Sequence, residues 1–217
     1  MSARVWYEGR TSLDLRTGGD WAWIGLRSGD GLNRLHSDLL AALDRLCIDL
    51  RWAGARRVAL SSAGWMDGRG RHFSAGADLH EAGALDPVSA DPFARRGQRV
   101  MDHLLWPGWR SLTVISGVAM GGGCDLALHG QERWAVEAGP DGRGGLRLAH
   151  PAAKHGILTG FGGTVRLPEL LGSAGAGRLF RDFEAWDGAA ALAAGAIHRR
   201  LVPAAVRTAV EAWLSGQ

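Results

Sequence analysis

Three consecutive glycines, Gly121 to Gly123, lie where the chain is expected to pass from a strand into a helix. The β-branched run Thr113 to Ser116 has the composition of a buried strand, and Cys124 to Leu128 is typical of the first turns of an apolar helix. Glycine allows a tight turn and a close approach to the backbone, and a helix start leaves N–H groups unpaired at the positive end of the dipole. This arrangement can hold a phosphate, a carboxylate or a developing oxyanion. A glycine turn without any chemistry is the alternative.

A second stretch of small residues follows another predicted strand. Residues 72–79, His-Phe-Ser-Ala-Gly-Ala-Asp-Leu, come after the predicted buried strand Arg57 to Ser62 and again allow close approach to the backbone. A third motif spans residues 150–172, HPAAKHGILTGFGGTVRLPELLG, and a further segment spans residues 30–43, DGLNRLHSDLLAAL. Several motifs in a fixed order are far more specific than any one of them.

Taken in their order along the chain, residues 30–43, 72–79, 121–123 and 150–172 resemble the crotonase (enoyl-CoA hydratase/isomerase) superfamily. The third motif is similar to the family pattern Pro-Glu-x-x-x-Gly-(apolar)-x-x-Gly-x-Gly-Gly-Thr-x-Arg-Leu, and residues 30–43 are similar to the start of the N-terminal helix. The resemblance covers roughly residues 20–203 and implies an α/β fold, a spiral (superhelix) of ββα turns with a short C-terminal helical region. We expect a single domain with its core in residues 1–203 and a shortened C-terminal helix in residues 204–217.

The resemblance also implies how the protein assembles. Family members usually form trimers or dimers of trimers, and they commonly continue for several more helical turns that pack across the pocket or onto a neighbour. We therefore expect a homotrimer or hexamer. Because this sequence stops early by comparison with the family, we also expect part of the usual lid to be missing or supplied differently.

Specific backbone groups are implied to act on a substrate. In the family, two N–H groups bind the carbonyl oxygen of a thioester and stabilise the enolate or oxyanion formed from it; matched by motif, they belong to Ala77 and Gly122. The residues expected on the coenzyme A side of the site are Ala75, Ala77, Asp78, Leu79, His80, Gly121 and Gly122. Asp78 is also predicted to cap the following helix.

The acid–base groups are where this chain departs from the family. A family hydratase uses two glutamates; the first position is Asp125 here, one methylene shorter, and the second is Ala152, which has no carboxyl group. The aspartate that some relatives use for dehalogenation or ring closure is Gly160. His150 could approach the space of the missing glutamate, with a structural role as the alternative. For Asp125, the helix dipole favours the ionised form and burial opposes it.

Alternating strands and helices must position these residues, a pattern that favours an α/β fold. Residues from Glu81 to Pro92 are small, acidic and proline-containing, which predicts a mobile loop; in the family the matching region covers the acyl-CoA pocket. The turn-forming run Gly139 to Gly145 is longer than the family crossing, so it is an insertion close to the site. Asp30 is a candidate N-cap for a helix. The apolar face of that helix is predicted from the spacing of Leu35, Leu39, Leu43, Leu46, Cys47 and Leu50.

Composition excludes several other classes of protein. The chain has 217 residues, 46% of them apolar and 22% charged, which fits one globular domain rather than a disordered chain. Its 25 Lys and Arg against 22 Asp and Glu leave a net charge of +3, too small and too scattered for a nucleic-acid-binding surface. No apolar run reaches membrane-spanning length and residues 1–20 have no signal-peptide core, so we expect a cytoplasmic protein without a membrane partner. The ten tryptophans are expected in the core and at subunit contacts.

The preferred hypothesis is a crotonase-type enzyme acting on an acyl-CoA or acyl-carrier-protein thioester, a hydratase/isomerase-like lyase or isomerase with no metal or nucleotide cofactor. Hydration would lack one of its two carboxylates, whereas isomerisation, decarboxylation or hydrolysis require fewer. A non-catalytic thioester-binding or accessory subunit with the same fold is the main alternative. A dinucleotide-binding turn fails on spacing, because MGGGCD lacks Gly-x-Gly-x-x-Gly. A thiolate nucleophile at Cys124 is also conceivable at a helix start, but packing is preferred.

Overall fold

The computed structural model describes residues 2–5, 11–66 and 72–217. The strands in these residues are β1 Ser2–Val5, β2 Thr11–Gly18, β3 Trp21–Ser28, β4 Arg57–Ser62, β5 Arg110–Ile115, β6 Val118–Met120, β7 Glu132–Val136, β8 Arg147–Ala149, β9 Ala185–Trp186 and β10 Arg199–Leu201. The α-helices are α1 Ser37–Trp52, α2 Leu79–Gly83, α3 Pro87–Leu104, α4 Gly122–His129, α5 Gly163–Phe180, α6 Gly188–Ala193 and α7 Val206–Ser215. Short 3₁₀ turns occur at Ala63–Trp65, Pro151–His155 and Pro203–Ala205.

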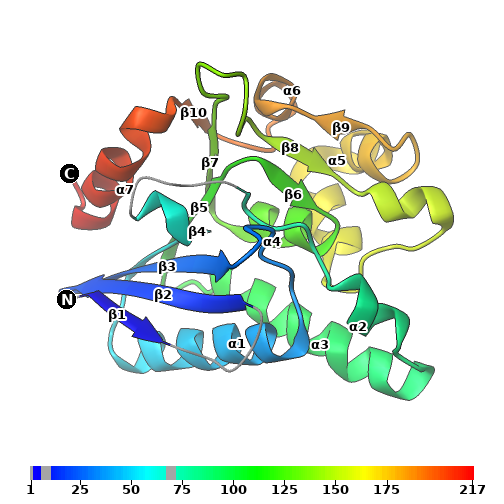
Figure 1. Ribbon diagram of the computed structural model, residues 1–217, viewed down its shortest axis with the longest axis horizontal. Helices are drawn as coiled ribbons and strands as arrows, with labels where there is room; N and C mark the ends of the chain where they lie inside the picture. The colour runs from blue at the N-terminus through cyan, green and yellow to red at the C-terminus, as the bar shows by residue number, and fades with distance from the viewer. Residues whose placement is uncertain (1, 6–10, 67–71) are drawn as a thin grey trace.

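A seven-stranded sheet forms the centre of the described structure, in the order β1-β2-β3-β4-β5-β7-β10 (Figure 1). The first three strands pair antiparallel, whereas β3, β4, β5, β7 and β10 are parallel to their neighbours. Because these strands run in the same direction, their carboxyl ends all lie at the same edge of the sheet. The loops that follow β4 and β5 at this edge lead into the two glycine motifs.

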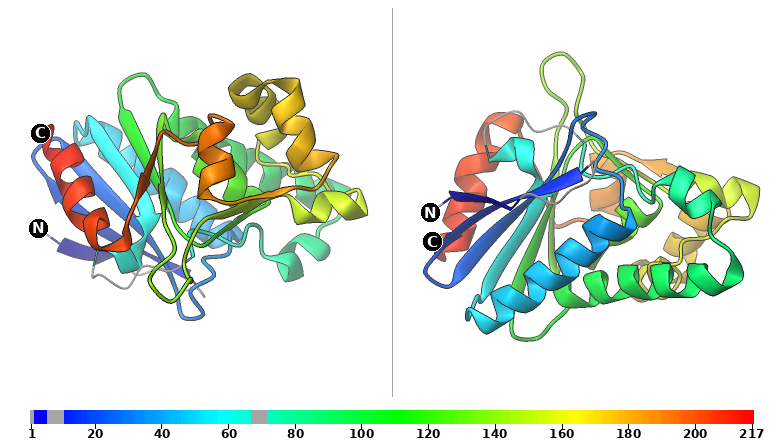
Figure 2. Two further views of the ribbon diagram at one scale, coloured as in Figure 1. Left: turned by 90° about the horizontal axis from the view of Figure 1, so that it is seen from above. Right: turned by 60° about the horizontal axis from the view of Figure 1, so that its bottom comes forward.

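Both faces of this sheet are covered. Helices α1 and α3 lie side by side across one face and α7 packs on the other, as Figures 1 and 2 show. The side chains of β3 alternate accordingly: Ile24 and Leu26 belong to the core beneath α1 and α3, and Trp23 belongs to the core beneath α7. The six residues of the predicted apolar helix face are all buried, although Leu35 precedes the helix.

A second, smaller sheet produces the spiral. It has the order β6-β8-β9, and Ser74 adds an isolated parallel bridge to Ala119 in β6. Successive turns of the chain therefore contribute a strand to the large sheet, a strand or bridge to the small sheet, and a helix. This confirms the predicted α/β spiral of ββα turns.

The predicted loop from Glu81 to Pro92 is wrong, because this segment is helical over much of its length. Helix α2 ends at Gly83, and α3 begins at Pro87 with a capping box: the Asp86 carboxylate accepts the N–H of Ser89, and the Ser89 hydroxyl accepts the N–H of Asp86. A capping box with proline at the first helical position specifies a helix start. These local signals outweigh the small, acidic composition on which the loop prediction depended.

The predicted cap at Asp30 is also wrong. Its carboxylate accepts the N–H of Leu32 within a turn, and α1 begins only at Ser37, where the His36 side chain serves as the cap. A short polar side chain can satisfy either a turn or a helix end, and here the turn prevails.

The C-terminal helix α7 completes the face of the sheet that is rich in tryptophan. Its Val206, Val210 and Leu214 are buried in one cluster with Trp23 and Trp134, which confirms the core location predicted for several tryptophans. The division at residue 203 stays a prediction. Within the described ranges, no helix is both long and apolar enough to cross a membrane.

Candidate active site

The loop after residue 72 is fixed by hydrogen bonds on both sides of Ala77. The N–H of Ala75 binds the carbonyl of Leu32, that of Gly76 binds the Ser74 hydroxyl, and that of Asp78 binds the carbonyl of Leu35. The N–H of Ala77 is the exception, with no hydrogen-bond acceptor among the described residues. The loop therefore holds one unpaired donor in a rigid frame.

The glycine triplet packs directly against this loop. Gly76 has a φ of +91°, and a Cβ there would lie 2.4 Å from the Met120 carbonyl oxygen and 3.3 Å from the Gly122 nitrogen. A Cβ on Gly123 would lie 2.4 Å from the Ser74 carbonyl oxygen. Only glycine permits this approach, so the spacing of the glycines brings residue 77 and the first turn of α4 together.

The start of α4 supplies the second unpaired donor. The N–H of Gly121 binds the carbonyl of Ala149, and that of Asp125 closes the first helical turn onto Gly121. Gly122 is the first residue of the helix, so its N–H has no intrahelical acceptor. Two unpaired donors thus lie in adjoining segments, one of them at the positive end of a helix dipole.

Asp125 lies one turn along α4 and is completely buried. Its Oδ2 is hydrogen-bonded to the Thr159 hydroxyl, which in turn accepts the N–H of Phe161. Its Oδ1 lies 3.5 Å from His150 Nε2. A Cβ on Gly163, at the start of α5, would be only 1.9 Å from Oδ1, so α5 also requires glycine where it meets the carboxyl group.

Burial decides the protonation of this group. Removal from water raises the pKa of Asp125 to about 7, although the hydrogen bond from Thr159 and the nearby Gly163 backbone act in the opposite direction. Burial also lowers the pKa of His150 to about 4, and its ring lies against that of Phe180, with centroids 4.5 Å apart. At neutral pH the carboxyl group is therefore partly protonated and the imidazole is neutral.

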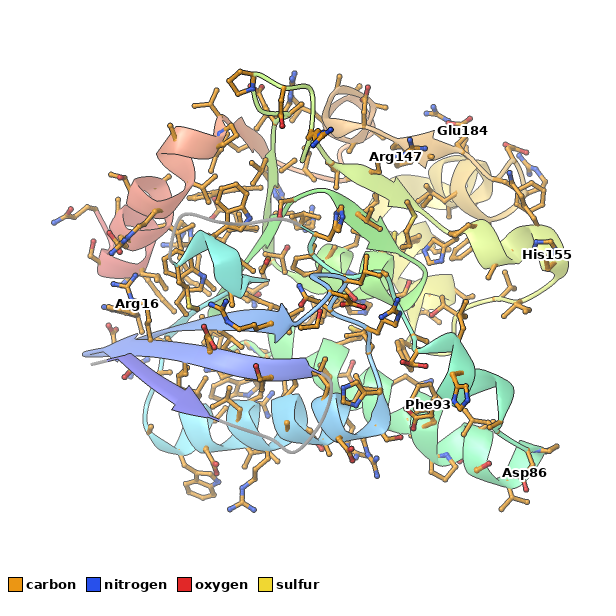
Figure 3. The ribbon with its side chains drawn as sticks, in the orientation of Figure 1. Arg16, Asp86, Phe93, Arg147, His155 and Glu184 are labelled. Atoms are coloured by element: carbon orange, nitrogen blue, oxygen red, sulfur yellow. The ribbon has the colours of Figure 1, made fainter. Side chains whose placement is uncertain are left out.

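The histidine, and not residue 152, reaches the carboxyl group. Ala152 is half-buried in the 3₁₀ turn and presents only a methyl group. His155, at the end of the same turn, is exposed at the outer edge of the molecule (Figure 3). Sequence reasoning thus identified both Asp125 and His150, and the structure places their side chains face to face.

The residues predicted on the coenzyme A side lie in two segments and differ in exposure, with Gly122 buried. Ala75, Ala77, Asp78 and Gly121 are half-buried, whereas Leu79 and His80 are exposed. The Asp78 carboxylate accepts the N–H groups of His80 and Glu81, which confirms the predicted cap of α2.

Sequence reasoning missed Thr159 and Phe161. The ring of Phe161 is buried between Gly122 on α4 and Gly97 on α3, where added Cβ atoms would lie 2.6 Å and 2.1 Å from it. It also contacts Phe93, labelled on α3 in Figure 3, at 5.3 Å between centroids. The sequence signal was their position four and two residues before Gly163, inside the third motif, but nothing in it showed that they face α4.

Another prediction concerns Cys124, the residue before Asp125. Cys124 is buried, and burial raises the pKa of its thiol, so it packs in the core as preferred. Thr159 and His150 lie beside the Asp125 carboxyl group, and Phe161 and Leu35 lie beside Gly122.

The predicted insertion borders a different hollow. A cavity of about 740 Å³ is lined by residues that include Trp65, His72, Arg143 and Arg207, and none of its lining residues is a predicted site residue. The insertion is held by a bond from the Gly117 N–H to the Gly144 carbonyl, just before β6.

A ββα spiral in which two glycine loops meet above a buried carboxyl group defines a crotonase-type protein. The family model for enoyl-CoA hydratase/isomerase matches residues 63–214, more than half of the 217-residue chain. The chain belongs to the enoyl-CoA hydratase/isomerase family.

Individual relatives agree with this assignment. A probable enoyl-CoA hydratase of Bacillus subtilis is 34% identical over 166 residues, which are 76% of this chain and 58% of the relative. The solved structure of Pseudomonas aeruginosa DspI is 28% identical with a TM-score of 0.81, covering 94% of this chain and 73% of that one. An enoyl-CoA hydratase structure from Bacillus anthracis has the same fold, with a TM-score of 0.81 at 23% identity over 96% of this chain and 76% of that one. The chain thus spans little more than half the length of the B. subtilis relative.

Proposed function

We propose that this protein is an acyl-thioester enzyme that polarises the thioester carbonyl between the N–H groups of Ala77 and Gly122 and uses Asp125 as its main acid or base. The observation that carries the proposal is the pair of unpaired N–H groups in two interlocked glycine segments, with a buried carboxyl group one helical turn away. Preorganised backbone donors of this kind stabilise charge that develops on a carbonyl oxygen.

The electrostatics favour proton transfer by Asp125. With a pKa of about 7, the carboxyl group populates both forms near neutrality. The ionised form accepts an α-proton or a proton from water, and the carboxylic acid form returns a proton to an enolate. A general acid or base is most effective when its pKa lies near the working pH.

Hydration is the family reaction for which this chain is least equipped. Ala152 provides no second carboxylate, so hydration would depend on His150 to supplement Asp125. Isomerisation, decarboxylation or hydrolysis of the thioester require fewer positioned groups.

The substrate class follows from the family. The B. subtilis relative carries the name of an enoyl-CoA hydratase, which supports a coenzyme A thioester; an acyl-carrier-protein thioester has the same reacting atoms. Ala75, Asp78, Leu79, His80 and Gly121 would contact the carrier, because they form the accessible edge of the loop. No metal or further cofactor is required for this chemistry.

Asp125→Asn tests the role of the carboxyl group. The amide keeps the size of the side chain but cannot transfer a proton, so kcat on a responsive acyl-CoA should fall about 10²- to 10⁴-fold with little change in thioester affinity. Turnover is measured by mass spectrometry over a panel of acyl-CoAs, and affinity by retention in native spectra. Asp102→Asn, at an exposed position on α3, is the matched control and should behave as wild type. Unchanged turnover in Asp125→Asn, together with its loss in His150→Ala, would move the role to the histidine.

A thioester-binding subunit without catalysis is the second candidate. Two observations favour it: residue 152 has no carboxyl group, and Asp125 is fully buried with Phe161 packed on Gly122. In that case native spectra would show retained acyl-CoA, but no member of the panel would turn over, and neither Asp125→Asn nor His150→Ala would alter binding.

A further inference from the structure

Two buried polar atoms face each other without any hydrogen-bond partner. Asp125 Oδ1 and His150 Nε2 are both unpaired within the described residues, and they lie 3.5 Å apart. The two side chains are 0% and 3% exposed. An unpaired buried polar atom is costly, so two such atoms aimed at each other need a common explanation.

The other carboxylate oxygen is already committed. Asp125 Oδ2 is hydrogen-bonded to the Thr159 hydroxyl, whose oxygen also accepts the N–H of Phe161. Thr159 lies in the loop before α5, so a different segment from the one that carries His150 holds this oxygen. Oδ1 is therefore the oxygen that lies toward His150.

We propose that Asp125 Oδ1 and His150 Nε2 hold a single proton between them, with Thr159 as the positioning residue that fixes which oxygen takes part. The proposal deepens the proposed function, since it concerns the same carboxyl group, but it does not depend on turnover. In the protonated state the carboxylic acid donates to an unprotonated Nε2, and the imidazole carries its hydrogen on Nδ1. When the pair loses its proton, the imidazole shifts its own hydrogen to Nε2 and donates to the carboxylate.

The charges on neighbouring elements are compatible with this state. On α4, burial keeps Cys124 as a thiol and lowers the pKa of His129. On α5, Arg166 acts on His129 and lies 4.0 Å from Glu169. Lys154, in the 3₁₀ turn after His150, is exposed. Burial outweighs these charges for both members: it raises the pKa of Asp125 and lowers that of His150, so the pair retains one proton over the intervening range.

Sharing one proton gives the site an acid and a base without a net charge. The carboxylic acid can donate, and the adjacent imidazole nitrogen can accept. A protein that lacks the second carboxylate thereby keeps two proton-transfer groups in contact, and the buried site avoids an isolated ion.

The tautomer of His150 tests the proposal directly. In the full-length protein labelled with carbon-13 histidine, the ring Cδ2 shift of His150 should report a change from the Nδ1–H to the Nε2–H form, with a midpoint near pH 7 and without ring protonation. His129 is the internal control, because its Nδ1 lies 2.7 Å from the Asp125 carbonyl oxygen and must donate to it. Its tautomer should stay the same across the titration.

Three variants complete the experiment. Asp125→Asn should abolish the change at His150. Thr159→Val removes the hydrogen bond that lowers the pKa of Asp125, so the midpoint should rise by about one pH unit. Thr159→Ser restores the hydroxyl and should return the midpoint to its wild-type value.

The proposal would be overturned if the Cδ2 chemical shift of His150 stayed constant from about pH 5 to 9. This range covers about two pH units on either side of the expected midpoint. The proposal would also be overturned by a tautomer change that persists in Asp125→Asn, or by equal midpoints in Thr159→Val and wild type. If Asp125→Asn does not fold, the two Thr159 variants decide. Because none of these readings uses turnover, an inactive protein with the tautomer change would reject the proposed catalysis and leave the shared proton intact.

Discussion

At the scale of single residues, two forces act in opposite directions on Asp125. The start of α4 favours a negative charge, whereas complete removal from water opposes it. Burial is the larger effect, since it raises the pKa of the carboxyl group to about 7 despite the hydrogen bond from Thr159 and the nearby Gly163 backbone, which lower it. The residue therefore combines a pKa near neutrality with a cost to stability at high pH.

This cost gives a prediction for the pH dependence of stability. Because the folded protein binds the Asp125 proton more tightly than the unfolded chain, the contribution of this residue is fully present below pH 4 and is lost as pH rises through about 7. The free energy of unfolding of wild type minus that of Asp125→Asn should decrease by up to about 4 kcal/mol over this range. Urea unfolding of both proteins between pH 4 and 8 measures it; a difference that is constant, or that increases with pH, would contradict the raised pKa.

Gly76 provides the residue-scale test of the oxyanion site. Alanine at a φ of +91° would place its methyl group 2.4 Å from the Met120 carbonyl oxygen, so the loop must shift and carry the Ala77 N–H with it. Loss of one oxyanion donor typically lowers kcat about 10²- to 10³-fold, and Gly76→Ala should do the same in the acyl-CoA assay.

The control for this substitution is Gly83→Ala at the end of α2. Nothing lies within 4 Å of the added methyl group there, so turnover should be unchanged. Equal activity of the two variants would mean that the loop does not hold a catalytic donor.

At the scale of elements, the site is a junction between α4 and α5. Neither helix alone forms it: α4 supplies Asp125, and the loop and first turn of α5 supply Thr159 and Gly163. The packing is so close that the α5 backbone lies directly on the carboxyl group, which excludes water and raises the pKa of Asp125.

Two glycines of α5 distinguish this junction from ordinary helix packing. Gly163→Ala would press a methyl group into Asp125 Oδ1 and should destabilise the protein by about 1–3 kcal/mol through overpacking. Gly177→Ala, in the same helix, meets only the end of the Arg181 side chain at 3.3 Å and should be neutral or stabilising by up to about 1 kcal/mol. Thermal or urea unfolding compares them, and equal effects would argue against the close contact at Gly163.

At the scale of the whole molecule, several large apolar side chains lie on the outer surface. Trp52 on α1 and Val88 on α3 are 88% and 81% exposed. Exposed apolar residues are common when they are isolated, but larger apolar surfaces indicate contacts with other chains. They are consistent with the assembly that the family resemblance implies.

We therefore expect light scattering at micromolar concentration to give three or six times the mass of one chain, because closed cyclic assembly would cover these side chains. Dilution should not dissociate the assembly at once if the interface is of the size that stable oligomers require. A monodisperse monomer at micromolar concentration would contradict the prediction.

The sequence alone determined the local architecture and most of the site residues. The β-branched strands and the spacing of apolar residues predicted alternating strands and helices, since these signals act over a few neighbouring residues. The family resemblance carried by the ordered glycine motifs implied that they form a ββα spiral. The same motifs predicted Ala77, Gly122, Asp125 and His150 as site residues, and their catalytic roles stay a prediction. Two predictions made from residue type and composition were wrong: the helix cap at Asp30 and the loop from Glu81 to Pro92. Each depended on which backbone groups a side chain would satisfy, and composition does not show this.

Tertiary structure decided what those residues meet. Asp125 and His150 are 25 positions apart, and only the passage of β8 beside β6, together with the docking of α5 on α4, brings Oδ1 to 3.5 Å from Nε2. Thr159 became part of the site in the same way, since its hydroxyl can reach Asp125 only after the two helices have packed. The protonation of Asp125 also depends on this packing, because desolvation is a property of all the surrounding atoms and of no single motif.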